Sequence, residues 1–159
     1  EVPIPVIQRG LEIAKRNNVP TILNPAPAVT LPDEVYGLCD YFTPNETEAS
    51  FLAGIPVDTK EQASEAAQIF IDRGVKTAVI TLGENGVYVQ NPDISQHIPA
   101  FNMGNKVIET TGAGDAFNGG FAYALAEGIP LTEAVRYGSA TAAISVTRLG
   151  TAPAMPYKS

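Results

Sequence analysis

The sequence TKEQASEAAQIFIDRGVKTAVITL, residues 59–82, decides the fold class. Its first four residues, 59–62, form a capping box that predicts the start of a helix. Apolar residues at helical spacing follow, and Gly74 marks the end of that helix. The run 75–82 is apolar almost throughout, as expected for a central strand that is covered on both faces. A helix followed by such a strand is typical of an α/β protein with a parallel sheet.

The same alternation continues on both sides of this stretch. Toward the N-terminus we expect helices over about 5–17, 32–38 and 45–53, and short strands over 20–23 and 40–43. Toward the C-terminus we expect a strand at 87–90, one or two edge strands within 94–103, a strand ending at 110 or 111, and helices at 113–126 and 132–146. The predicted fold is therefore α/β, a Rossmann-like, mostly parallel sheet with flanking helices, in one domain over residues 1–159.

Composition and charge exclude several classes of protein. The net charge is −7 and Lys and Arg form no cluster, so neither nucleic acid nor an anionic membrane is an expected partner. No apolar run has the length of a transmembrane segment. The single cysteine, Cys39, fits a cytoplasmic protein and is expected in the core. The only histidine, His97, is expected on an exposed edge strand, so a Cys–His nucleophile and a zinc site are excluded.

The stretch VIETTGAGDAFNGG, residues 107–120, has the pattern of a strand, a glycine-rich turn and a helix. Such a turn directs several backbone N–H groups at one point, at the positive end of the helix. Asp115 adds a carboxylate in the first helical turn, and an anion cradle beside a base indicates transfer of a negatively charged group. The alternative is an ordinary glycine turn in which Asp115 only stabilises the helix N-terminus. Gly119 and Gly120 favour a packing or ligand reason, because each costs roughly 1 kcal/mol inside a helix.

Two other stretches follow predicted strands and have both a structural and a functional interpretation. Asn45 with Glu48 forms a capping-box-like helix start, and Glu48 at the end of a strand is also suited to orienting a hydrated Mg²⁺. The two roles are compatible. The loop 81–86 is either a tight connection between strands or a backbone segment close to a phosphate or an adenine.

Together these stretches resemble the ribokinase-like (phosphofructokinase-B) family of sugar kinases. Residues 107–120 are similar to the family's C-terminal signature, in which Gly-Ala-Gly-Asp precedes a small-residue helix. Asn45-x-x-Glu48 is similar to its Asn-x-x-Glu motif, and 81–86 to its nucleotide loop. The stretches 24–27 and 146–150 resemble the ribokinase branch of the family. The resemblance spans nearly the whole chain.

This resemblance implies an ATP-dependent carbohydrate kinase that converts D-ribose to D-ribose 5-phosphate in the intact enzyme. Asp115 would take the proton from the attacking sugar hydroxyl, and the anion hole would comprise the backbone of Gly112, Ala113 and Gly114. ATP would contact Gly114 and Asp115 and also Asn45, Thr81, Leu82, Gly83, Glu84, Asn85, Gly86 and Ser139. Glu48 would organise Mg²⁺, and Glu1 would lie near the sugar. A monovalent cation, K⁺ in the family, would be held by Glu109, Thr111, Ser145, Arg148, Gly150 and Ala154.

The sequence also departs from the family pattern. Glu109 stands where the family usually has Asp, and Ala154 where it often has Ser, so the identity and need of the cation stay open. The family's N-terminal half, with its lid and most sugar-binding residues, has no counterpart here. We therefore expect a partial domain, the nucleotide-binding half of a homodimeric enzyme, without turnover of its own. The alternatives are a family kinase for fructose, a ketodeoxy sugar acid or a nucleoside, and a non-catalytic nucleotide-binding module.

Overall fold

The structure is a computed structural model of the chain and describes residues 1–157. Its α-helices are α1 (Ile4–Arg16), α2 (Asp33–Tyr36), α3 (Glu46–Ala53), α4 (Lys60–Asp72), α5 (Ala113–Ala126) and α6 (Leu131–Ser145). Its strands are β1 (Ile22–Leu23), β2 (Tyr41–Phe42), β3 (Thr77–Thr81), β4 (Val87–Gln90) and β5 (Ser95–Ile98). Three short 3₁₀ helices are η1 (Gly83–Asn85), η2 (Gly104–Lys106) and η3 (Ala152–Ala154).

The five strands form one mixed sheet in the order β1-β2-β3-β4-β5. The pairs β1–β2 and β2–β3 are parallel, with Ile22 opposite Tyr41 and Tyr41 opposite Thr77. Only the residues 82–86 join the neighbouring strands β3 and β4, a connection short enough only for an antiparallel pair. The predicted α/β fold with a Rossmann-like sheet and flanking helices is confirmed.

The chain divides into two compact units. The first comprises residues 1–82 and 88–97, and the second comprises 83–87 and the residues from Ile98 onward. The single domain over 1–159 stays a prediction. No helix within residues 1–157 has both the length and the apolar composition that a membrane span requires.

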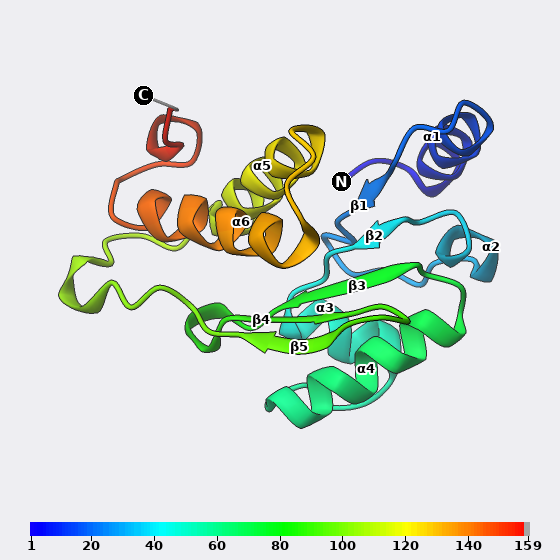
Figure 1. The fold of residues 1–159 in the computed structure, drawn as a ribbon, viewed down its shortest axis with the longest axis horizontal. Coiled ribbons are helices and arrows are strands. Elements are labelled where there is room, and N and C mark those ends of the chain that lie inside the picture. The colour runs from blue at the N-terminus through cyan, green and yellow to red at the C-terminus, as the bar shows by residue number, and fades with distance from the viewer. Residues whose placement is uncertain (158–159) are drawn as a thin grey trace. The chain divides into compact units, whose positions relative to one another are not determined.

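The core of the first unit forms between the sheet and α4, which contacts β3. In Figure 1 α4 lies along one side of the sheet. Ala63, Ala66, Ala67 and Phe70 give α4 its buried face, as the helical spacing predicts. Every residue of β3 from Thr77 to Ile80 is also buried. The ring of Phe70 packs edge-on against Phe42 of β2, with 5.0 Å between ring centroids. The helix and the strand predicted within residues 59–82 thus build this core.

Local signals set the ends of α4. Thr59 is the N-cap, its side chain accepts a hydrogen bond from the Gln62 backbone N–H, and the Gln62 side chain accepts from the Thr59 N–H. These bonds satisfy two N–H groups that the first turn of a helix leaves without partners. The helix ends at Asp72, and Gly74 follows with a φ of +106°. The predicted capping box and stop are confirmed.

The second unit is built around α5 and α6, which pack side by side (Figure 1). A Cβ atom on Gly120 would lie 2.3 Å from Oγ1 of Thr141, and one on Gly138 would lie 2.8 Å from the carbonyl oxygen of Phe117. These two glycines let the helices approach each other more closely than alanine would. The packing reason expected for a glycine inside a helix is therefore found at Gly120. It is not found at Gly119, where a Cβ would meet nothing within 4 Å.

The structure corrects two expectations about strands. The strand predicted to end at Thr110 or Thr111 does not form, and residues 107–110 have no regular secondary structure. The N–H groups of Ile108 and Glu109 donate instead to the carbonyl oxygen of Val146 at the end of α6, at 2.8 and 3.2 Å. The apolar β-type run meets a helix end here rather than a partner strand. Within 94–103 there is one strand, β5, on which His97 is partly buried rather than exposed.

Candidate active site

The N-terminus of α5 is shaped by the glycine turn before it. Gly112 is the N-cap residue and adopts a left-handed conformation with a φ of +81°. A Cβ atom at this position would also lie 3.2 Å from the Thr151 side chain. The positive φ favours glycine, since other residues reach this φ only with strain, and the tight contact with Thr151 adds to that preference. Because glycine has no side chain to cap the helix, the first turn of α5 is left without a side-chain acceptor.

The backbone N–H groups of this turn have different partners. The N–H of Ala113 donates to the Thr110 carbonyl oxygen at 3.1 Å, so this predicted anion-hole donor is engaged in the turn itself. Within residues 1–157 the structure records no hydrogen bond from the N–H of Gly112, Gly114 or Asp115. The open donors are therefore Gly112 and Gly114, two of the three residues assigned to the anion hole, together with Asp115, whose N–H was not assigned to it.

Asp115 lies at the third position of α5 with an exposed side chain. Among residues 1–157 the structure records no hydrogen bond or ion pair to its carboxylate. A carboxylate within the first turn, next to open N–H donors, is placed to interact with a hydroxyl group that reacts with an anion bound there. The second unit thus brings the predicted base and the anion cradle together.

The predicted cation residues also belong to the second unit. Oε2 of Glu109 accepts a hydrogen bond from the Gly150 N–H at 2.9 Å, which joins segments 41 residues apart. The Arg148 side chain donates to the Ala154 carbonyl oxygen at 3.5 Å. The buried Ser145 hydroxyl donates to the Ala142 carbonyl oxygen within its own helix. Of the predicted set only Thr111 is an exposed residue outside these contacts.

The first unit brings together Asn45, Glu48 and Thr81. Oδ1 of Asn45 accepts from the Glu48 N–H at 2.8 Å, and Oε2 of Glu48 accepts from the Asn45 N–H at 2.9 Å, which confirms the capping box. Asn45 forms an isolated parallel bridge with Thr81 at the end of β3. Glu48 is 8% exposed, and one of its carboxylate oxygens is occupied by the cap. The structure records no hydrogen bond to the other oxygen among residues 1–157, and the metal role of Glu48 stays a prediction.

The loop after β3 has a structural reason for its last glycine. Gly83, Glu84 and Asn85 form the exposed 3₁₀ turn η1, preceded by the buried Leu82. Gly86 has a φ of +98°, and a Cβ atom there would lie 2.2 Å from the Ile98 carbonyl oxygen. The Gly-x-x-Gly spacing is therefore explained at Gly86 by a close approach of the backbone, whatever the loop binds.

Two further predicted residues lie apart from these sets in the sequence. Oγ of Ser139 on α6 is buried and has no hydrogen-bond partner among the described residues. A buried hydroxyl without a partner is costly, so this atom is a candidate for an additional polar contact. Glu1 is exposed, and its terminal ammonium donates to the Ala26 carbonyl oxygen at 2.7 Å.

Other candidate chemistry in the chain has a structural explanation. Burial raises the pKa of the Cys39 thiol to about 12, with a smaller contribution from Asp40, so the thiol stays protonated and unreactive, as a core residue should. No group of three or more His, Cys, Asp or Glu residues within 1–157 is arranged to hold a metal ion.

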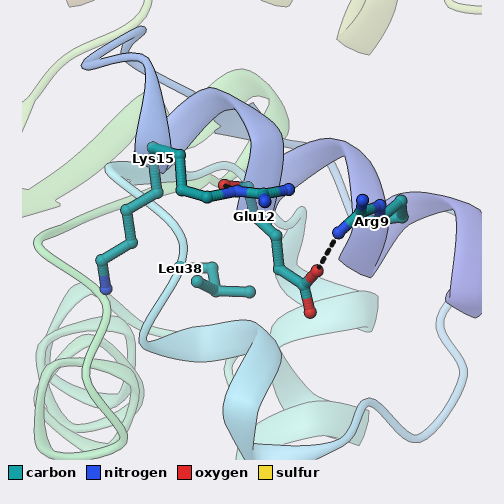
Figure 2. Close-up of a pocket in the computed structure, with 5 residues that line it drawn as sticks. Arg9, Glu12, Lys15 and Leu38 are labelled. Atoms are coloured by element: carbon teal, nitrogen blue, oxygen red, sulfur yellow. Dashed lines mark hydrogen bonds and ion pairs between the residues drawn. The ribbon is translucent and has the colours of Figure 1, made fainter.

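A surface hollow of about 320 Å³ is lined by Arg9, Glu12, Lys15, Arg16 and Leu38. Figure 2 labels Arg9, Glu12, Lys15 and Leu38 among the side chains around it. None of these residues was predicted to carry chemistry. Arg9 pairs with Glu12 at 3.1 Å, and Nζ of Lys15 donates to the carbonyl oxygen of Gly37, the C-cap residue of α2. These charged groups stabilise two helices, and their exposure makes each pair worth little.

Comparison with known proteins agrees with this geometry. The profile of the family described as pfkB family carbohydrate kinase matches residues 1–158. The chain is 46% identical over 156 residues to a ribokinase of Haemophilus influenzae, covering 98% of this chain and 50% of that protein. It is 37% identical over 157 residues to a deoxyribokinase of Salmonella typhi, covering 98% and 51%. The chain thus spans about half the length of the curated relatives it matches.

The solved structures also match nearly the whole of this chain and about half of their own chains. An Arabidopsis thaliana ribokinase complexed with ribose and ATP superposes with a TM-score of 0.87 at 35% identity, covering 97% of this chain and 50% of that one. A ribokinase from Thermotoga maritima gives a TM-score of 0.80 at 42% identity, covering 92% and 49%.

Proposed function

This chain belongs to the pfkB family of carbohydrate kinases, and from that premise we propose that the intact protein phosphorylates D-ribose with ATP. The products are D-ribose 5-phosphate and ADP. The observation that carries this proposal is the N-terminus of α5, where open backbone N–H groups adjoin the exposed carboxylate of Asp115. Similarity to ribokinases over nearly the whole chain supports ribose as the acceptor.

The chemistry follows from that arrangement. The Asp115 carboxylate takes the proton from the attacking sugar hydroxyl. The sugar oxygen then bonds to the γ-phosphorus while the bond from that phosphorus to the leaving ADP oxygen breaks. The open N–H groups of Gly112 and Gly114 donate to the oxygens of the transferring phosphoryl group, on which charge is concentrated. Ala113 contributes by holding the turn through its bond to Thr110.

The nucleotide is proposed to contact Asn45, Thr81, Leu82, residues 83–86 and Ser139. The unpartnered Ser139 hydroxyl supports this assignment, because a polar ligand would satisfy it. Glu48 would hold Mg²⁺ through the carboxylate oxygen that the cap does not use, since this ion typically binds to one or two carboxylates and the substrate phosphates. The ion neutralises phosphate charge when bound.

The monovalent cation is proposed for the segment around Glu109. The oxygen atoms of Glu109, Thr111, Ser145, Arg148, Gly150 and Ala154 suit a hard cation, several of them as backbone carbonyls. The Glu109–Gly150 hydrogen bond holds two of these positions together. The same family resemblance extends the proposal to a cytoplasmic homodimer.

A second acceptor, 2-deoxy-D-ribose, is favoured by the similarity to a deoxyribokinase. The two sugars differ only in one hydroxyl, and a site built to bind that hydroxyl rejects the sugar that lacks it. A panel of ribose, deoxyribose, fructose, a ketodeoxy sugar acid and a nucleoside, assayed with the full-length protein, separates these possibilities. A nucleotide-binding module without catalysis would phosphorylate none of them.

The test of the mechanism is Asp115→Asn in the full-length protein. We expect kcat to fall by roughly 100-fold or more, because general-base catalysis contributes at least that much, while ATP affinity stays within a few-fold. Asp33→Asn, which changes another exposed aspartate in a first helical turn, is the matched control and should leave kcat unchanged. Loss of ATP affinity together with turnover would mean that Asp115 has a structural role, and full turnover in the variant would refute its role as the base.

A further inference from the structure

Asn118 makes a contact that the mechanism above does not use. It lies in α5, one turn after Gly114, and its Nδ2 donates to the Gly114 carbonyl oxygen at 2.9 Å. Asparagine is a poorer helix former than alanine, and a side chain that bonds to the carbonyl four residues earlier slightly disfavours a helix. By intrinsic helix propensity alone, alanine would suit this position better than asparagine.

The carbonyl that Asn118 contacts belongs to the peptide group between Gly114 and Asp115. The same planar peptide unit that carries the Gly114 carbonyl also carries the N–H of Asp115. That N–H is one of the open donors at the start of α5. A hydrogen bond to the carbonyl restrains the orientation of the plane, and it polarises the group so that the N–H on its other side becomes a stronger donor.

We propose that Asn118 is a positioning residue for phosphoryl transfer. Its amide fixes and polarises the peptide between Gly114 and Asp115, so that the Asp115 N–H points at the transferring phosphoryl group. This fixed peptide also anchors the Cα from which the Asp115 carboxylate extends. The inference rests on the proposed kinase function, and it adds a residue that acts through the backbone of the site without touching the substrate.

Two substitutions in the full-length protein separate this role from a structural one. Asn118→Ala removes the donor, whereas Asn118→Ser supplies a hydroxyl that bonds to the carbonyl four residues earlier. We expect Asn118→Ala to lower kcat by roughly 3- to 10-fold, the range for one neutral hydrogen bond, with the KM for ATP unchanged. Asn118→Ser should keep at least half of the wild-type kcat. Thermal stability should follow the opposite order, with the alanine variant at least as stable as the serine variant.

The kinetic and stability measurements on these variants decide the role of Asn118. Equal kcat values for the alanine and serine variants, a wild-type kcat for the alanine variant, or activity that follows the melting temperature would overturn the role of Asn118. Those results leave the proposed kinase function intact as long as the wild type phosphorylates a sugar and Asp115→Asn does not. A wild-type protein that phosphorylates no carbohydrate would overturn both.

Discussion

Gly86→Ala tests a close backbone approach in the second unit, between the loop before β4 and residues 98–100. Gly86 follows η1 with a φ of +98°, and an alanine Cβ would lie 2.2 Å from the Ile98 carbonyl oxygen and 2.8 Å from the Ala100 nitrogen. These are backbone atoms, so no side chain can rotate away. The substitution must move either the loop or the segment after β5.

The expected loss of stability has two parts. A non-glycine residue in a left-handed conformation costs roughly 1–2 kcal/mol, and forcing extra volume into a packed site costs about 1–3 kcal/mol. We therefore expect Gly86→Ala to lower the free energy of unfolding by about 2–5 kcal/mol. Gly128 has a φ of +73° and open space around a Cβ, so Gly128→Ala should cost only the first part. Gly119→Ala, inside α5 with nothing within 4 Å, should stabilise the protein by about 0.5–1 kcal/mol.

The assay is urea denaturation of the full-length protein and the three variants, followed by far-UV circular dichroism. From the highest to the lowest urea concentration at half-unfolding, the expected order is Gly119→Ala, wild type, Gly128→Ala and Gly86→Ala. A Gly86→Ala midpoint equal to or above that of Gly128→Ala would refute the close approach, because the two variants share the backbone cost and differ in the steric one.

Two further predictions concern groups whose chemistry the structure constrains. Glu48→Gln keeps an oxygen that accepts the Asn45 N–H, whereas Glu48→Ala loses it, so denaturation should show a loss of about 1 kcal/mol for alanine only. Both variants should need more Mg²⁺ for half-maximal turnover, and unchanged Mg²⁺ titrations would remove Glu48 from the metal site. The Cys39 thiol keeps its proton up to a pKa of about 12 in the folded state but loses it near its ordinary value of 9.0 when unfolded, so this group makes stability fall as pH rises from about 9 toward 12. Native protein at pH 8.5 should react with a thiol reagent only after denaturation, and rapid labelling of native protein would contradict its burial.

The sequence alone predicted the features that depend on neighbouring residues. The capping box at 59–62 and the one at 45–48 both form as their spacing indicates. The start of α5 after the glycine turn and the place of Asp115 in its first turn likewise follow from a few consecutive residues. Such features are readable because their hydrogen bonds close within one turn of the chain. The burial of β3 was also predictable, for a different reason: its continuous apolar run requires cover on both faces of the strand.

Only the tertiary structure decided features whose partners lie far along the chain. Residues 107–110 have a β-type composition, yet their N–H groups bond to Val146, because a strand needs a neighbouring strand and a helix end lies there instead. The Glu109 carboxylate is held by Gly150, and Gly86 is required by the backbone at Ile98. Residue type fixes what a group can bind, but the fold determines which partner lies within reach.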